Sequence, residues 1–442
     1  MKTAPRDLWF GILAIALGIN LLIGYRVYSR EAEATGEKEA FEKVSVMMHV
    51  LSLIRQDYVD GAKTDYQDLL YGAMRGMVSS LDPFSEFMTP AEHRNMLELT
   101  EGKFGGLGIT ITIRKGMLTV VAPIDDSPAS RAGILPGDQI TKIGDVPSSE
   151  MDMKTVLQQF KGEPGTKVTF TVYRPATQQT LPFALERAVI EIPSVTDVKV
   201  LDDGIGYLRI TEFSEKTAEK LKEALETLQK QQMKALVLDL RNNPGGLLPA
   251  AVDVCSFFLP GKRLVVSTEG RRPSQKQEYL TDSRPKIPNA MPMAILVNQG
   301  SASAAEIVSG CLQDWGRAIL VGEKTFGKGS VQSLIDLADG SALRLTTAMY
   351  YTPSRRLIHE YGIEPDIVVA LSEKEMKRLL EIEPGAEDRG PDPAVDRQLQ
   401  RAIESLKTYD VWTKAREARF SKLRPAEEAK TEPPPKTPAP GK

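Results

Sequence analysis

Histidine, cysteine and net charge are all scarce in this chain of 442 residues. Its three histidines are His49 and His93, in a region with a helical pattern, and His359, in a polar turn, so a Ser-His-Asp arrangement is poorly supplied. The two cysteines, Cys255 and Cys311, are too few for a disulfide framework or a cysteine zinc cluster. Each lies among apolar residues at helical spacing, which favours two buried thiols and leaves a single bridge between them open. The net charge of -3 argues against a nucleic-acid-binding protein.

What the chain does contain is an ordinary globular composition and one long uncharged stretch near its start. Hydrophobic residues make up 41% and charged residues 26%, and the length suggests about three domains. Residues 8–25 carry no charge and follow Lys2 and Arg6; the stretch is short for a membrane span but too long for the hydrophobic region of most signal peptides. No small-x-small cleavage site follows, so residues 1–30 are predicted to form an uncleaved signal anchor. The basic start should stay in the cytoplasm, which places the rest of the chain beyond the inner membrane, in the periplasm or extracytoplasmic space.

Periodicity divides the remainder into segments. Residues 40–100 have apolar residues at helical spacing, which predicts an N-terminal helical segment. Residues 101–187 contain short strand-like runs, and residues 188–372 alternate strand and helix, which argues for an α/β core. A C-terminal helical segment is expected over residues 373–423 and a disordered Pro- and Lys-rich tail over residues 424–442. Predicted core strands lie at residues 205–210, 235–240, 264–268, 293–297 and 318–321.

One serine lies on a sharp turn between a predicted strand and a predicted helix. The apolar run of residues 293–297 leads through turn residues 298–300 into a helical pattern that opens near Ser303. Such a turn exposes a hydroxyl beside helix N-terminal N–H groups, whose partial positive charge favours the negative charge that develops on a substrate oxygen during acyl transfer. The same residues also fit a capping box formed by Ser303 and Glu306, and on this feature alone the cap is the better interpretation.

A Gly-rich loop further along the chain supplies a candidate base. Lys328 stands between two glycines, and Gln332 follows four residues later. A neutral lysine can replace histidine, and bringing its pKa from about 10.4 to about 7 costs roughly 4 to 5 kcal/mol, which burial in an apolar site can supply. The side-chain carbonyl of Gln332 can then orient the amine. This loop shifts the balance toward Ser303 as a nucleophile.

The run of residues 300–304, Gly-Ser-Ala-Ser-Ala, together with Lys328 and Gln332 resembles the C-terminal processing peptidases, also called tail-specific proteases. The resemblance implies that Ser303 is the nucleophile, that Lys328 is the general base and that Gln332 positions the lysine. Residue chemistry alone does not choose between Ser301 and Ser303, so this assignment rests on the resemblance.

A second glycine-rich run, Leu-Arg-Asn-Asn-Pro-Gly-Gly, follows an apolar strand-like stretch. Gly245 and Gly246 can present free amides to a substrate carbonyl, although glycines after a proline are, as a lone signal, ordinary turn punctuation. The whole run resembles the oxyanion segment of the same family. The resemblance implies that a glycine amide here and the Ala304 amide form the oxyanion hole. Asp239 and Arg241 are interpreted as a structural ion pair.

Residues 101–187 resemble a PDZ domain of the bacterial protease type, because short strands, an Ala-Gly-Ile-Leu-Pro-Gly-Asp turn and a helix follow one another in that order. The resemblance implies a loop whose amides bind the C-terminal carboxylate of a peptide, while the next strand pairs with the peptide. Taken alone, a Gly-rich hairpin is more often a turn. Arg174 is interpreted as a solvated arginine, with coupling of peptide binding to the active site as the alternative. The implied loop residues are Gly105, Gly106, Leu107, Gly108 and Ile109.

The expected fold is α/β: a crotonase-like serine protease core with an inserted PDZ domain, an N-terminal helical segment and an N-terminal membrane anchor. The expected function is that of a serine endopeptidase that recognises and cleaves proteins near their C-termini outside the cytoplasm. Its partners would be protein or peptide substrates with free C-termini, the membrane and, in a homo-oligomer, copies of itself; no cofactor, metal or nucleic acid is expected. Two other classes stay open, an enzyme of thioester chemistry and a PDZ peptide-binding scaffold with an inactive protease core. The presence of Ser303, Lys328 and Gln332 argues against both.

Overall fold

The computed structural model describes residues 41–114, 116–282, 285–288, 290–372, 375, 392 and 394–409. It divides between Phe87 and Met88 into two compact units, which are described separately. The predicted membrane anchor and the predicted tail of residues 424–442 lie outside the described residues. Among the residues that are described, no helix combines the length and the apolar composition needed to cross a bilayer.

The N-terminal unit is helical. A first helix occupies residues 41–57, and α2 (Tyr66–Ser79) follows the short 3-10 helix η1 (Gly61–Lys63). Asp65 caps α2, because its side chain accepts hydrogen bonds from the amides of the second and third residues after it. Many apolar side chains of the first helix are exposed rather than packed into a core: Phe41, Val44, Val46, Met47, Met48, Val50, Leu53 and Ile54.

The larger unit is built on a six-stranded sheet with the order β10-β11-β12-β15-β16-β19. The pairs from β11 to β19 are parallel, and β10 is antiparallel to β11. The central strands are buried on both faces, which is why the sequence writes them as continuous apolar runs. The strands are β10 (Val195–Leu201), β11 (Ile205–Ile210), β12 (Ala235–Asp239), β15 (Met293–Val297), β16 (Ile319–Gly322) and β19 (Ile367–Val368).

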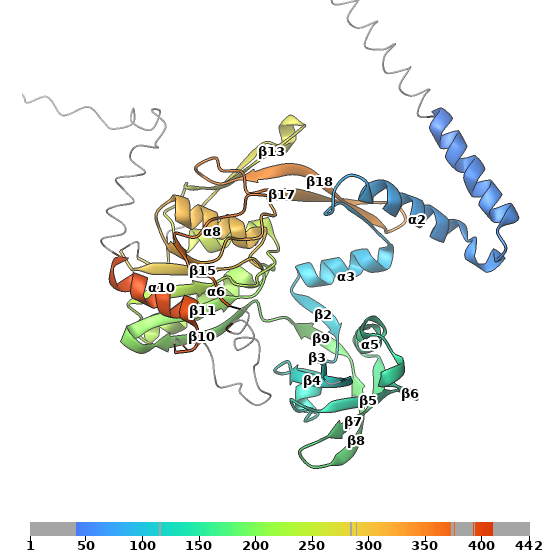
Figure 1. Cartoon of the computed structure of the whole chain (residues 1–442), viewed down its shortest axis with the longest axis horizontal. Coiled ribbons are helices and arrows are strands. Elements are labelled where there is room, and N and C mark those ends of the chain that lie inside the picture. Colours follow the sequence, from blue (N-terminus) through green and yellow to red (C-terminus); the bar gives the residue numbers. More distant parts are fainter. Residues whose placement is uncertain are drawn as a thin grey trace, which may run out of the picture. The chain divides into compact units, whose positions relative to one another are not determined.

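Helices cover both faces of this sheet. Successive strand residues point to opposite faces, and Leu236 and Leu238 share one core with residues of α6, α7 and α8. Val237, between them, belongs to a second core with Leu399 of α10. The helices α8 and α10 therefore lie on opposite sides of β15 (Figure 1). These helices are α6 (Thr217–Lys230), α7 (Leu248–Ser256), α8 (Ala304–Asp314) and α10 (Arg397–Lys407).

The same unit contains a second sheet, which is antiparallel and whose strand β17 directly follows the Gly-rich loop. Its strand β17 pairs with β18, which pairs with β13, which in turn pairs with β14. The strands are β13 (Leu264–Gly270), β14 (Gln277–Leu280), β17 (Ser330–Asp336) and β18 (Ala342–Tyr351). The same sheet includes β1 (Glu86–Met88), and the further elements outside the smaller domain are α3 (Pro90–Thr100), η3 (Asp202–Gly204) and η4 (Pro273–Gln275).

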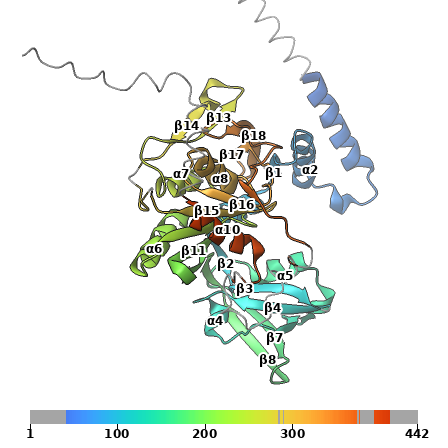
Figure 2. The same cartoon turned by 60° about the vertical axis from the view of Figure 1, so that its left-hand side comes forward.

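A smaller domain with its own core lies between β2 and β9 in the chain (Figure 2). Its sheet has the order β3-β4-β5-β7-β8, with β6 paired to β5 and β3 at an edge. The strands β2 and β9 pair with each other where the chain enters and leaves this domain. The elements are β2 (Lys103–Gly106), β3 (Ile109–Arg114), β4 (Met117–Pro123), α4 (Pro128–Arg131), β5 (Gln139–Ile143), β6 (Val146–Pro147), η2 (Ser148–Glu150), α5 (Met153–Phe160), β7 (Lys167–Arg174), β8 (Gln179–Glu186) and β9 (Ala188–Glu191).

Periodicity predicts most of the core elements. The strands expected at residues 205–210 and 293–297 have these bounds in β11 and β15. The sequence does not predict β10 or β14, because both are partly exposed and carry polar residues that interrupt an apolar run. The C-terminal helix α10 falls within the segment predicted over residues 373–423, of which the structure describes only residues 375, 392 and 394–409.

Candidate active site

Ser303 lies where β15 passes through a tight turn into α8. Its φ of 54° and ψ of -114° form a conformation that residues other than glycine rarely adopt. Strain of this kind costs about 1–3 kcal/mol and collects at functional sites. The amides of Glu306 and Ile307 donate to the carbonyl oxygen of Ser303 (2.9 and 3.0 Å), and its hydroxyl caps no helix amide. The predicted capping box of Ser303 and Glu306 is present: Oε2 of Glu306 accepts from the amide of Ser303, and the amide of Glu306 donates to the carbonyl oxygen of Ser303 rather than to its hydroxyl.

Ser301, the other serine of the run, is fully buried. Its hydroxyl donates to the carbonyl oxygen of Leu240 (2.8 Å) and accepts from the amide of Asn298 (3.0 Å). The first of these hydrogen bonds holds the turn against Leu240, the residue that follows β12, and the second closes the turn itself. Ser301 thus has a structural role, which leaves Ser303 as the candidate nucleophile of the two serines.

One buried carboxylate joins the Ser303 turn to the Gly-rich loop. Oε2 of Glu306 accepts from the amides of Ser303 (2.9 Å) and Lys328 (2.8 Å). Its Oε1 accepts from the hydroxyl of Thr325 (2.5 Å) and the amide of Gly327 (2.7 Å). Burial raises the pKa of Glu306, and these four hydrogen bonds act in the opposite direction. The carboxylate fixes the backbone of the candidate nucleophile relative to that of the candidate base.

The surroundings of Lys328 favour a neutral amine. Burial lowers the pKa of Lys328, and the positive charge of Arg344 lowers it further. Arg344 lies in β18, opposite Leu334 of β17. A lysine base needs a lowered pKa because only the unprotonated amine can accept a proton.

Gln332 is anchored through its amide nitrogen. Nε2 donates to the hydroxyl of Ser330 (2.8 Å) and to that of Thr346 (3.4 Å), which leaves Oε1 as the end of the carboxamide that can accept from an amine. The structure also brings a histidine to this loop, which the sequence did not indicate. A Cβ added to Gly329 would lie 2.1 Å from the backbone nitrogen of His359.

The glycine run after β12 reaches the Ser303 turn. Gly245 has a φ of 101°, and a Cβ there would lie 2.7 Å from the Cβ of Ser303 and 2.9 Å from the nitrogen of Ala304. The amide of Ala302 donates to the carbonyl oxygen of Asn243 (2.9 Å). Only glycine fits so close to the turn, so this segment and the Ser303 turn form one platform.

The three residues predicted to supply oxyanion donors are not equivalent. The amide of Gly245 already donates to Oδ1 of Asn243 (2.8 Å). Phe213 and Gly246 form a parallel bridge, in which the amide of Phe213 donates to the carbonyl oxygen of Gly245 and the amide of Leu247 donates to the carbonyl oxygen of Phe213. In such a bridge the N–H of Gly246 points away from Phe213. Ala304 is the first residue of α8, and its N–H has no acceptor within the helix. Gly246 and Ala304 are therefore better placed as donors than Gly245.

In the smaller domain, the predicted carboxylate loop is shorter than the sequence pattern indicates. Gly105 and Gly106 belong to β2, Ile109 opens β3, and only Leu107 and Gly108 connect the two strands. Within the described residues β3 pairs with β4 alone. Its other side is an open sheet edge, which is the feature that peptide binding by strand addition uses.

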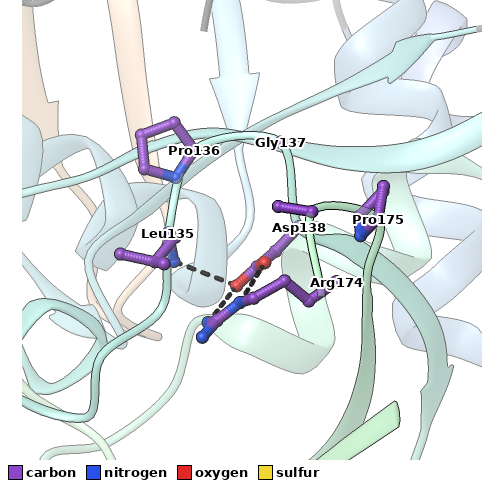
Figure 3. Close-up of a pocket in the computed structure, with 7 residues that line it drawn as sticks. Leu135, Pro136, Gly137, Asp138, Arg174 and Pro175 are labelled. Carbon is purple, nitrogen blue, oxygen red and sulfur yellow. Dashed lines mark hydrogen bonds and ion pairs between the residues drawn. The ribbon is translucent and has the colours of Figure 1, made fainter. Parts of the chain in front are cut away.

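Arg174 is not a solvated side chain, so that interpretation is wrong. Its guanidinium donates to both carboxylate oxygens of Asp138 (2.8 and 2.7 Å) and to the carbonyl oxygen of Gly133 (2.8 Å). Oδ2 of Asp138 also accepts from the amide of Leu135 (2.9 Å). Figure 3 shows this ion pair in the wall of a pocket of about 210 Å³.

The sequence motifs indicate the candidate serine, lysine and glycines, but they indicate Glu306 only as part of a helix cap. Every residue of α8 is buried, Glu306 included. An acidic residue inside such an apolar helix needs several hydrogen-bond donors. The position of Glu306 within an apolar helical pattern is therefore the sequence signal for its second role. Among the described residues, no group of three or more histidine, cysteine, aspartate or glutamate side chains is arranged to bind a metal ion.

The fold and this arrangement define a serine-type peptidase with a PDZ domain. The sequence profile of Peptidase family S41 matches residues 204–369, that of the PDZ domain matches residues 105–185, and that of the activating protease CtpB N-terminal domain matches residues 24–91. The chain is 39% identical over 368 residues to the carboxy-terminal-processing protease of Bartonella bacilliformis, covering 81% of this chain and 82% of the relative. It is 32% identical over 371 residues to the carboxy-terminal processing protease CtpB of Bacillus subtilis, covering 83% and 76%.

The chain belongs to the carboxy-terminal processing proteases of Peptidase family S41, as the resemblance predicted. A solved structure described as a putative S41 protease from Bacteroides fragilis has the same fold, with a TM-score of 0.51 at 18% identity. That comparison covers 81% of this chain and 97% of the other.

Proposed function

We propose that Ser303, Lys328 and Gln332 are the catalytic residues of this protease. Neutral Lys328 takes the proton of the Ser303 hydroxyl as Oγ attacks the scissile carbonyl carbon. The oxyanion formed accepts hydrogen bonds from the amides of Gly246 and Ala304. Lysine then gives its proton to the leaving amine, and water cleaves the acyl-enzyme with the same base. The observation that carries this proposal is the Glu306 carboxylate, which binds the backbone N–H groups of both Ser303 and Lys328.

The PDZ domain is the proposed receptor for the substrate's C-terminus. The open edge of β3 can pair with an extended peptide, and the amides at Leu107 and Gly108 precede this edge. A carboxylate bound by amides forms charge-assisted hydrogen bonds, so a free C-terminus should be favoured. Cleavage would follow upstream, where the bound chain enters the groove beside Ser303.

The experiment that tests this recognition uses a susceptible peptide with a free or an amidated C-terminus. Amidation removes the negative charge but leaves the scissile bond unchanged, so kcat/KM should fall about tenfold or more, mainly through KM. Rates are measured below KM for both peptides. Equal rates would reject carboxylate recognition while leaving the chemistry at Ser303 intact.

The proposed location is the inner membrane, with the catalytic part outside the cytoplasm. This rests on the uncharged residues 8–25 after Lys2 and Arg6. The full-length protein should fractionate with the inner membrane, retain its first residues and be digested by protease added from the periplasmic side. Recovery of a soluble protein that begins near Glu31 would show instead that the segment is a cleaved signal peptide.

A homo-oligomer is proposed through the helix of residues 41–57. Eight of its apolar side chains are exposed, and exposed apolar residues that cluster on one element are a common feature of protein–protein contacts. Sedimentation of residues 31–442 should show a dimer or larger species, and Val46→Glu with Val50→Glu should shift it to monomer. Lys43→Glu on the same helix is the matched control. A monomeric wild-type protein at micromolar concentration would contradict this assembly.

A further inference from the structure

Arg241, at the start of the proposed oxyanion segment, is bound by two parts of the chain. On the strand side, its Nη2 donates to Oδ2 of Asp239 (2.6 Å), and its Nε lies 3.0 Å from both oxygens of that carboxylate. The hydroxyl of Tyr207 donates to the same carboxylate (2.7 Å). Burial alone would raise the pKa of Asp239, but the charge and hydrogen bonds of Arg241 outweigh it and lower this pKa.

The second part is the beginning of α10. Oδ2 of Asp396 lies 2.7 Å from Nη2 of Arg241, and Oε1 of Gln398 accepts from Nη1 (3.1 Å). Both side chains are buried, and Nε2 of Gln398 donates to the carbonyl oxygen of Val369 (2.8 Å). These residues lie beyond residue 369, where the match to the family profile ends. Sequence analysis expected only the local pair of Asp239 and Arg241.

Asp396 uses its two oxygens for different tasks. Oδ1 accepts from the amide of Leu399 (3.0 Å) and caps α10, while Oδ2 faces Arg241. The helix itself is fixed to the sheet, because Leu399, Ala402 and Leu406 pack into the core that contains Val237. A rigid helix thus presents a carboxylate to the guanidinium.

The position of Arg241 bears on the catalytic platform through its neighbours. The amide of Asn242 donates to Oδ1 of Asn298 (2.8 Å), and the carbonyl oxygen of Asn243 accepts from Ala302 (2.9 Å). Both contacts connect the segment that follows Arg241 to the turn that carries Ser303. Two residues beyond Asn243, Gly245 lies against Ser303 itself.

We infer that Asp396 and Gln398 are positioning residues of this protease: by holding Arg241 from the opposite face of the sheet, the start of α10 keeps the oxyanion segment in register with Ser303. The inference rests on the proposed function. Loss of the contact should lower the rate of the chemical step, because small displacements of oxyanion donors are costly, and should leave ground-state peptide binding nearly unchanged.

The test separates the charge of Asp396 from its capping role. Asp396→Asn keeps a good N-cap but removes the charge, and it should lower kcat about 10- to 100-fold with KM changed less than about twofold. Asp396→Glu restores a carboxylate and should recover part of the lost kcat. Asp392→Asn is the control, because the only side-chain bond described for Asp392 is a local one to the amide of Ala394. Circular dichroism and thermal unfolding confirm that each variant is folded.

Wild-type kcat in Asp396→Asn would overturn the inference. Equal impairment in the Asn and Glu variants would overturn it too, because it would mean that the carboxylate charge is not what matters at this position. If Asp396→Asn does not fold, Gln398→Met removes one contact to Arg241 and should lower kcat by a smaller factor; an unchanged kcat would again overturn it. Ser303→Ala is assayed in parallel. Activity retained in Ser303→Ala would reject the proposed function, whereas an active Asp396→Asn beside an inactive Ser303→Ala rejects only the positioning role.

Discussion

Ser303→Ala is expected to reduce kcat/KM for a susceptible peptide by about 10⁴-fold or more while leaving the fold and peptide binding intact. The loss is large because the other hydroxyl in the turn, that of Ser301, is buried and already hydrogen-bonded. The hydroxyl of Ser303 caps no helix amide, so its removal should change the free energy of unfolding by less than about 0.5 kcal/mol. Activity and stability are measured on the same preparations by peptide cleavage and thermal unfolding.

Ser301→Ala is the matched control and should show the reverse pattern. It leaves the buried carbonyl oxygen of Leu240 and the amide of Asn298 without their hydroxyl partner, at a cost of roughly 1–3 kcal/mol of stability. Its activity should fall less than that of Ser303→Ala. Normal turnover in Ser303→Ala together with loss in Ser301→Ala would show that the nucleophile has been misassigned.

Lys328→Arg is expected to abolish cleavage, because an arginine stays protonated at every accessible pH. In the wild type, burial and Arg344 lower the pKa of Lys328. The protonated amine is inactive, so kcat/KM should rise about tenfold per pH unit below this pKa and level off above it. Arg344→Gln removes the second of the two causes and should move the midpoint to higher pH.

His359 provides the internal control for that experiment. Its backbone lies against Gly329, the residue that follows Lys328, so it is the histidine to test as an alternative base. His359→Gln should keep the wild-type pH midpoint. A midpoint that disappears in His359→Gln, or an active Lys328→Arg, would assign the base to histidine instead.

The proposed catalytic residues can be singled out in the sequence because they lie in short continuous motifs. Ser303 and Ala304 are adjacent, Gly245 and Gly246 are adjacent, and Lys328 and Gln332 are four residues apart. Local turn and helix signals predict such groups, and the resemblance assigns their roles. In the sequence, the choice of Ser303 over Ser301 rests on the resemblance alone; the structure adds that the Ser301 hydroxyl donates to the carbonyl oxygen of Leu240, the residue that follows β12.

What the sequence could not give is the set of contacts between distant segments. The second role of Glu306 depends on the Gly-rich loop folding back over α8, and the binding of Arg241 by Asp396 depends on α10 packing on the far face of the sheet. Neither contact leaves a periodic signal in the chain. Likewise, the sequence does not distinguish the amide of Gly245 from that of Gly246. In the structure the amide of Gly245 donates to the side chain of Asn243.

The central claim is that Ser303 is activated by Lys328. The most direct measurement is peptide mapping by mass spectrometry after reaction with a serine-directed fluorophosphonate over a range of pH. The account predicts a single adduct on Ser303, formed faster as pH rises through the lowered pKa of Lys328 and absent in Lys328→Arg. An adduct on Ser301, or labelling of Ser303 that proceeds equally well in Lys328→Arg, would contradict it.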